Sequence, residues 1–242
     1  MSDLDDLREE NVRLKERVQR LKARAGDQEL AYLFVVTYGR SGSTLVSGLL
    51  NAIPGYLVRG ENRDALRHLY EFHQQLVFNA RGPKGNFRKK THPFYGAGDF
   101  PEQRSIDGIR RLVLDTVLRP KADTRVVGFK EIRWYADDLV DYVSWLREVF
   151  PGARFLINTR AHADVLKSAW WAEGDAEQNA SHLAANEAQL LSLAHDLGEA
   201  AYRIHYDDYV ADPTVLRGLF DWLGEAWDED AVRATFEVKH SI

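Results

Sequence analysis

An unbroken apolar and aromatic run at residues 32–36, followed directly by a glycine-rich turn and a helical pattern, constrains the fold more than any other feature of the chain. Such a run is typical of a strand that is buried on both faces, as in a parallel sheet. Gly39 and Gly42 predict a tight turn, and residues 44–51 predict a helix that Pro54 and Gly55 end. The sequence therefore predicts a strand, a loop and a helix in direct succession.

The alternation of strand and helix continues along the chain. Residues 125–129, 153–159 and 202–206 predict further strands, and residues 139–150 and 181–200 predict amphipathic helices. Strands that alternate with helices form a parallel sheet with helices on both faces. We therefore expect an α/β fold, a three-layer sandwich with a central parallel sheet and a P-loop-like phosphate-binding turn. Residues 81–104, rich in Gly, Pro and basic side chains, predict a functional lid or a mobile loop.

The N-terminal segment carries a heptad repeat. Its a and d positions are Leu4, Leu7, Asn11, Leu14, Val18, Leu21 and Ala25. Leucine at every d position and a single asparagine at an a position favour a parallel two-stranded coiled coil. Residues 1–26 are therefore predicted to form a homodimer, and residues 31–242 to form one globular domain. The alternative is that this helix packs on its own domain.

Composition excludes several classes of protein. The 242 residues are 45% hydrophobic, enough for one substantial core, and the net charge of -5 argues against a nucleic-acid-binding protein. The chain has no cysteine, which excludes disulfides and fits a reducing compartment. Residues 1–6 show no signal peptide, and no stretch approaches the ~20 apolar residues of a membrane span. These features predict a cytoplasmic protein with no nucleic-acid partner and no membrane span.

The loop at residues 38–44 has the chemistry of an anion site. Backbone N–H groups and the N-terminus of the following helix would face a bound phosphate. A nucleotide-kinase loop has four residues between its glycines, then Lys and a Ser or Thr that holds magnesium. Here the glycines are three positions apart and the cation, Arg40, lies between them. This suits a shorter anion, such as a 5′-phosphosulfate bound without a metal, but a P-loop phosphotransferase (kinase) stays open as the alternative.

These residues resemble the sulfotransferases that use 3′-phosphoadenosine 5′-phosphosulfate (PAPS), whose loop reads Pro, Lys or Arg, Ser, Gly, Ser or Thr, then Thr. Gly39 replaces the usual proline. The resemblance covers most of residues 32–242 and implies a sulfotransferase domain at residues 31–242, with PAPS as co-substrate and PAP, the desulfated donor, as product. The donor-binding residues that it implies are Gly39, Arg40, Ser41, Gly42, Ser43, Thr44, Arg160, Ser168, Tyr206 and Lys239.

Two further segments carry the resemblance. Arg160 follows a predicted strand and Ser168 lies eight residues later, which is similar to the family's 3′-phosphate site. Residues 204–213 resemble the family's segment Tyr, Glu, Asp, Leu, three variable residues and Pro, where Tyr206 matches an aromatic residue near the adenine. At the chain end, Lys239 matches a basic loop that returns to the 3′-phosphate in related enzymes.

The resemblance also implies catalytic roles. Glu61 and Arg63 match the Glu-x-Arg tripeptide of tyrosylprotein and related sulfotransferases, in which the glutamate is the general base. Lys130 directly follows a predicted strand and would neutralise the departing phosphate oxygen. Arg40 in the loop is the third predicted catalytic residue, and Arg133 would bind an anionic donor or acceptor. Because cytosolic members use a histidine as base, three histidines are the rivals of Glu61: His68, His73 and His92.

The acceptor is predicted only by class. A basic region would attract an anionic acceptor, and three tryptophans would stack on sugar rings: Arg63, Arg81, Lys84, Arg88, Lys89, Lys90 and His92, with Trp134, Trp170 and Trp171. Of these, His92 and Trp171, with Arg63 and Arg133, are the predicted substrate-binding residues. We expect a glycan or glycoconjugate hydroxyl (carbohydrate sulfation), with a small hydroxylated metabolite as the alternative. A non-catalytic adaptor that works through the coiled coil is a third hypothesis.

Overall fold

The computed structural model describes residues 30–82, 87 and 89–238. The predicted coiled coil at residues 1–26 and Lys239 therefore lie outside the described residues. The five strands form one parallel sheet: β1 (Ala31–Val36), β2 (Tyr56–Arg59), β3 (Val126–Glu131), β4 (Arg154–Thr159) and β5 (Ala201–His205). Their order across the sheet is β2-β3-β1-β4-β5, so the first strand lies at the centre. This confirms the predicted α/β fold with a parallel sheet.

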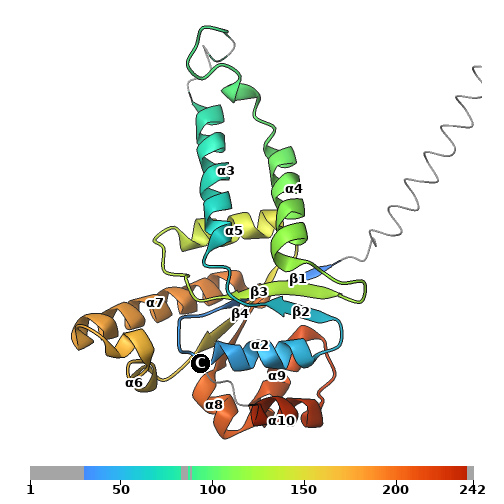
Figure 1. Ribbon diagram of the computed structural model, residues 1–242, viewed down its shortest axis with the longest axis vertical. Coiled ribbons are helices and arrows are strands. Elements are labelled where there is room, and N and C mark those ends of the chain that lie inside the picture. Colours follow the sequence, from blue (N-terminus) through green and yellow to red (C-terminus); the bar gives the residue numbers. More distant parts are fainter. Residues whose placement is uncertain (1–29, 83–86, 88, 239–242) are drawn as a thin grey trace, which may run out of the picture.

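Helices cover both faces of the sheet (Figure 1). One face carries α2 (Ser43–Ala52), α8 (Tyr206–Ala211), α9 (Arg217–Leu223) and α10 (Glu229–Glu237). The other face carries α3 (Ala65–Arg81), α4 (Glu102–Val113), α5 (Leu139–Val149) and α7 (Ala176–Leu197). Shorter helical segments are α6 (His162–Val165), η1 (Ala97–Asp99), η2 (Leu114–Leu118), η3 (Ala169–Ala172), η4 (Gly198–Ala200) and η5 (Pro213–Leu216).

The central strand explains how one apolar run serves two cores. Side chains of a strand alternate between the two faces of its sheet. Accordingly, Leu33 and Val35 pack with the residues around α2 and α9, whereas Phe34 and Val36 pack with those around α5 and α7. Every position of the run is needed because both faces are buried. Trp134 belongs to the second core, where it stacks against Phe129, so the hypothesis that Trp134 contacts a sugar is wrong.

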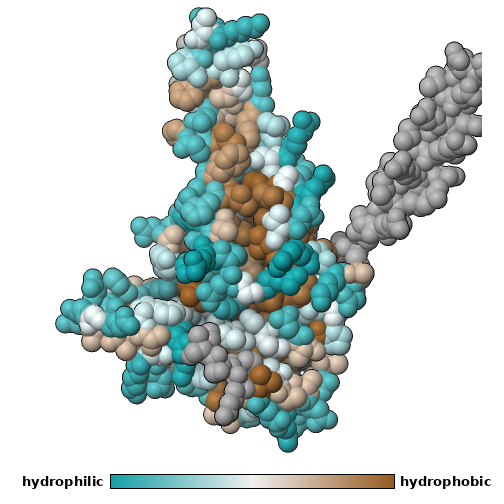
Figure 2. All heavy atoms as spheres, in the orientation of Figure 1, coloured by the Kyte–Doolittle hydropathy of each residue, from teal (hydrophilic) through white to brown (hydrophobic). Residues whose placement is uncertain are grey.

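Two helices that the sequence analysis did not predict, α3 and α4, form an arm that projects from the sheet (Figure 1). The described residues between them, which belong to the predicted loop 81–104, lie at the far end of this arm. Exposed aromatic side chains line parts of the arm, and Figure 2 shows apolar colour along it. The described part of this loop contains η1 and the start of α4, so it is less irregular than its composition predicts.

Candidate active site

The carboxyl ends of the five strands meet at one edge of the sheet, here called the site edge, and the predicted residues follow them. Glu61 comes two residues after β2, Lys130 lies in β3, the loop 38–44 follows β1, Arg160 follows β4 and Tyr206 follows β5. In the order of the strands, Glu61 and Tyr206 stand at opposite ends with the loop between them. Ligands of open parallel sheets bind at this edge, at the topological switch point where the order of the strands reverses.

The loop 38–44 has the backbone of an anion cradle. Arg40 and Gly42 adopt left-handed conformations, with φ of 69° and 80°. No side chain caps the N-terminus of α2, and its first turn carries no acidic residue. The positive end of the helix dipole and the first N–H groups of α2 are therefore available to an anion. Ser43 and Thr44 occupy this first turn.

Buried polar groups under the loop hold it in place. Asn158 in β4 donates from Nδ2 to the carbonyl of Ser41 at 2.8 Å, and the Thr37 hydroxyl donates to Ser41 Oγ at 2.6 Å. Ser41 as a whole has 0% exposure, so its hydroxyl supports the loop from beneath rather than facing a ligand. Tyr209 completes the support with a bond from its hydroxyl to Asn158 Oδ1 at 3.1 Å. The loop is thus preorganised rather than shaped by a ligand.

Both loop glycines are required by close neighbours. A Cβ atom on Gly42 would lie 2.0 Å from Cδ2 of Tyr206, and one on Gly39 would lie 2.4 Å from Cζ2 of Trp170. The Tyr206 ring therefore packs flush against the loop. It also lies 4.4 Å from the Arg160 guanidinium carbon, which places an aromatic face, a cation and the loop together.

Arg160, Arg40 and Ser168 form one cluster. Arg160 donates from Nη1 to the Arg40 carbonyl at 3.1 Å, and Arg40 donates from Nε to Ser168 Oγ at 2.7 Å. Arg160 Nε is buried and has no hydrogen-bond partner among the described residues. An unpaired buried donor on a cation fits a bound anion. The Arg40 side chain thus extends from the loop to Ser168, the predicted 3′-phosphate partner.

Tyr38, which the sequence analysis did not single out, links the loop to β4. Its hydroxyl accepts the N–H of Arg160 at 2.8 Å and donates to Glu187 Oε2 at 2.5 Å. Burial raises the pKa of the Tyr38 phenol, and the hydrogen bond to Glu187 raises it further. The phenol therefore keeps its proton and is the donor in this bond. His162 Nε2 lies 3.2 Å from the same carboxylate oxygen. Tyr38 thereby fixes the backbone position of Arg160.

The other end of the site edge carries Glu61 between two cations. Lys130 Nζ lies 2.5 Å from Glu61 Oε1, and Arg133 Nη1 lies 3.8 Å from Glu61 Oε2. Lys130 is nearly buried, while the Glu61 side chain keeps 34% of its surface exposed. A carboxylate with one fixed oxygen and one side open to solvent has the geometry of a proton acceptor.

Glu131 positions this end and was also missed. Its buried carboxylate accepts the N–H groups of Asn62 at 3.1 Å and Asp64 at 3.0 Å through Oε2, and that of Ile132 at 2.9 Å through Oε1. Arg133 Nη1 contacts Glu131 Oε1 at 3.1 Å. A polar or charged residue that continues an apolar strand, as in the run at 126–131, is the sequence signal that could have identified it. Asn158 gives the same signal at the end of β4.

Other predicted residues lie apart from this centre. His73 is buried between Phe100 and Trp145, with 1% exposure, so it is closed to an acceptor and cannot be the base. His68 is exposed and lies 3.5 Å from Glu71. His92 packs against Phe87 and Phe94 in the segment that joins α3 to α4, at the far end of the arm. The structure does not bring any of these histidines to Lys130.

The remaining predicted substrate-binding residues lie near the site edge. Arg63 is exposed in the turn between β2 and α3, two residues after Glu61. Trp171 donates from Nε1 to the Gly39 carbonyl at 3.1 Å and lines a pocket together with Arg133. Within the described ranges, no cluster of metal-binding side chains is present, and no helix is long and apolar enough to cross a membrane.

Comparison with known proteins decides the family. A family model described as "Sulfotransferase family" matches residues 33–229, which is most of the chain. The chain belongs to the sulfotransferase family. Membership makes it a sulfuryl-transferring enzyme and confirms the resemblance found in the sequence. No curated protein matches the sequence.

A solved sulfotransferase structure shares the fold. The sulfotransferase domain from the curacin biosynthetic pathway aligns with a TM-score of 0.56 and 16% identity, covering 87% of this chain and 79% of that one. Sulfotransferase STF9 from Mycobacterium avium aligns with a TM-score of 0.41 and 13% identity, covering 90% of this chain and 71% of that one. The curacin domain therefore has the same arrangement of a parallel sheet between helices.

Proposed function

We propose that this sulfotransferase transfers a sulfuryl group from PAPS to a hydroxyl of an acceptor, with Glu61 as the general base. The observation that supports this most is the order of groups along the site edge. An aromatic face and two guanidinium groups lie at the β4 and β5 end, an anion cradle lies in the middle, and a carboxylate between cations lies at the β2 and β3 end. A donor with phosphate at both ends of one nucleoside fits the first two parts.

The residues at the β4 and β5 end suit this donor. Arg160 and Ser168 would hold the 3′-phosphate, the loop and the N-terminus of α2 would hold the 5′-phosphosulfate, and Tyr206 would contact the adenosine. Arg40, which reaches Ser168, would join the 3′-phosphate cluster or turn back over the loop. When bound, PAPS supplies the activated sulfuryl group and a phosphate leaving group. A planar guanidinium pairs with phosphate through two parallel bonds, which explains arginine at both positions.

The residues at the β2 and β3 end would activate the acceptor. Glu61 would take the proton of the acceptor hydroxyl as the acceptor oxygen bonds to sulfur and the bond from sulfur to the 5′-phosphate oxygen of PAPS breaks, with PAP leaving. Lys130 would hold the carboxylate by its bond at Oε1 and stabilise the negative charge that develops on the departing oxygen. The acceptor would approach the sulfur from the Glu61 side, and PAP would leave on the Arg160 side. An in-line displacement requires this opposite placement of the attacking and leaving groups.

A single substitution tests the base. Replacing Glu61 with Gln keeps the shape but removes the proton acceptor, so we expect Glu61→Gln to slow sulfuryl transfer about 10²–10⁴-fold. The affinity for PAP should stay within about twofold, because Glu61 stands at the other end of the site edge. Transfer from ³⁵S-labelled PAPS and calorimetry with PAP measure the two quantities. Unchanged turnover would remove Glu61 from the mechanism.

A kinase would share the fold and the phosphate-binding loop. The two functions differ in the nucleotide that the protein binds. A kinase loop has a lysine directly after its second glycine, but Ser43 follows Gly42 here. A ligand that binds the folded state raises the melting temperature, and at equal concentration the ligand that binds more tightly raises it more. We expect PAP without metal to raise Tm more than Mg-ATP at equal concentration. A larger shift with Mg-ATP would favour the phosphotransferase.

A further inference from the structure

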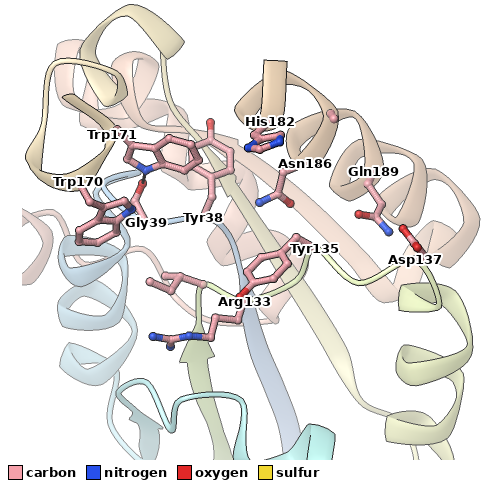
Figure 3. A pocket seen from close by; sticks show the side chains of 12 residues that line it. Tyr38, Gly39, Arg133, Tyr135, Asp137, Trp170, Trp171, His182, Asn186 and Gln189 are labelled. Carbon is pink, nitrogen blue, oxygen red and sulfur yellow. Dashed lines mark hydrogen bonds between the residues drawn. The ribbon is translucent and has the colours of Figure 1, made fainter. Parts of the chain in front are cut away.

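A pocket of about 580 Å³ opens beside the loop 38–44 on the α7 side of the sheet (Figure 3). Three parts of the chain form it. These are the start of the loop, the segment after β3, and η3 with α7, which contribute Tyr38, Arg133, Tyr135, Trp171, Asn186 and Gln189 among others. Pockets of roughly 300–1,000 Å³ are the size that proteins use for small molecules.

The pocket adjoins both halves of the proposed chemistry. Gly39 belongs to the loop, and Arg133 lies 3.8 Å from Glu61 Oε2, yet both line the pocket. A molecule held here would lie between the loop and the proposed base. This is the place of the acceptor if the proposed function holds, and the inference rests on that function.

The walls favour a flat ring. Tyr135 and Trp170 keep 62% and 53% of their surface exposed, although aromatic side chains of this size are usually covered. Trp171 is fixed by its bond to the Gly39 carbonyl, and Figure 3 shows these rings around the opening. Aromatic faces at a pocket stabilise the apolar face of a sugar or a second aromatic ring.

One polar group in the pocket lacks a partner. Asn186, on α7, is 9% exposed, and its Oδ1 atom has no hydrogen bond from any residue the structure describes. Figure 3 shows its side chain directed into the pocket between Tyr38 and Tyr135. A buried acceptor without a donor is unfavourable in a folded protein, so its retention points to a ligand that supplies the donor.

The charges of the lining balance. Arg133 and Asp137 are the two residues of opposite formal charge among the lining residues. Arg133 Nη1 already lies near the carboxylates of Glu61 and Glu131, so the positive charge of Arg133 is balanced within the protein. The basic residues that favoured an anionic acceptor in the sequence, among them Lys89 and Lys90, lie in the segment at the far end of the arm.

We propose that this pocket holds the acceptor and selects an uncharged alcohol with one or two rings. The ring packs against Tyr135 and Trp171, and a hydroxyl of the acceptor donates a hydrogen bond to Asn186 Oδ1. Asn186 is thus a specificity-determining residue, and a polyanionic glycan is disfavoured as acceptor.

Two glycosides that differ only at C6, a hydroxymethyl group against a carboxylate, provide the test: 4-nitrophenyl β-D-glucoside and 4-nitrophenyl β-D-glucuronide. Transfer from ³⁵S-labelled PAPS should give a KM for the glucoside at least about tenfold below that for the glucuronide. In Asn186→Leu the KM for the glucoside should rise about 5–10-fold, the effect of one lost hydrogen bond. Gln178→Leu, an exposed position of α7 outside the pocket, is the matched control and should not change KM.

Stability separates a ligand contact from a structural one. Because Asn186 Oδ1 is unpaired, Asn186→Leu should leave Tm unchanged or raise it, whereas a structural asparagine would lower Tm when replaced. An unchanged KM in Asn186→Leu, or a preference for the glucuronide, overturns the inference. If PAP binds but neither glycoside is sulfated, the acceptor proposal fails while the donor site stands. If PAP does not bind the parent protein, the proposed function itself fails.

Discussion

At the scale of single residues, Gly42 shows how backbone and ligand chemistry meet. Its φ is 80°, and the ring of Tyr206 occupies the space that a side chain at this position would need. An alanine here would be strained by about 1–2 kcal/mol and would also push Tyr206 away from Arg160. We expect Gly42→Ala to weaken PAP binding at least about tenfold, measured by calorimetry.

Gly152 provides the control for this substitution. Its φ is 73°, and a Cβ atom there would meet nothing within 4 Å. It lies between α5 and β4, at the opposite edge of the sheet. Gly152→Ala should therefore lower Tm through the same backbone strain and leave the PAP affinity unchanged. Equal PAP affinity in both variants would show that the contact between Gly42 and Tyr206 does not shape the donor site.

Asp64 makes stability depend on pH. Burial, and after it the charge of Glu131, raise the pKa of Asp64 from 3.8 to about 6. A carboxyl whose pKa is raised by folding leaves stability unaffected below the unfolded value near 4 and lowers it progressively as pH rises through about 6. Above that pH the folded protein carries an unfavourable charge at Asp64.

Removing this charge should stabilise the protein by an amount that grows between about pH 4 and pH 6 and stays constant above pH 6. Asparagine tolerates the left-handed backbone of position 64, where φ is 61°. After an allowance for solvent screening, Asp64→Asn should gain about 1 kcal/mol at pH 8, or about 2–4 °C in Tm, and nothing at pH 4. Scanning fluorimetry from pH 4 to 8 measures this, with exposed Asp123→Asn as the control. A gain that does not vary with pH would contradict the assigned cause.

At the scale of elements, the turn from β2 to α3 depends on one carboxylate of β3. Glu131 accepts the N–H groups of Asn62 and Asp64, the residues that flank Arg63 just after Glu61. In Glu131→Gln an amide N–H₂ replaces one of the accepting oxygens, so the turn loses a bond and Glu61 shifts. Misplacement of a catalytic group by about 1 Å costs on the order of 10²-fold in rate, and we expect kcat to fall by that order.

Glu225 is the matched control for Glu131. It is a largely buried carboxylate that pairs with Arg125, and this bond lowers the pKa of Glu225. Glu225→Gln should lower Tm without changing kcat, whereas Glu131→Gln should lower kcat and leave PAP affinity unchanged. Loss of kcat in both variants would indicate a general effect of stability.

The sequence predicted the elements whose patterns are local. The four long apolar strands and the helices α2, α5 and α7 were found because both faces of the sheet are buried and the helices are amphipathic. The strand β2 was missed because four residues are too few to show a period, and the arm α3–α4 because its exposed aromatics, such as Phe72 and Phe78, obscure an apolar stripe.

At the scale of the whole molecule, the site arises from the strand order. The placement of Arg160 and Tyr206 on one side of the loop and of Glu61 and Lys130 on the other follows from the order β2-β3-β1-β4-β5. Motifs identified these residues, but the roles of the supporting side chains Tyr38, Glu131 and Asn158 were missed, because their partners come from other elements. The homodimer through residues 1–26 and a cytoplasmic location stay predictions.

A crystal structure of the protein with PAP tests the central claim, that one nucleotide spans the middle and the β4 and β5 end of the site edge. We expect the 5′-phosphate on the N–H groups of residues 39–44 and the 3′-phosphate on Arg160 and Ser168, with Glu61 facing the open side of the loop. A structure in which PAP binds elsewhere, or in which Arg160 and Ser168 contact no phosphate, would contradict the account.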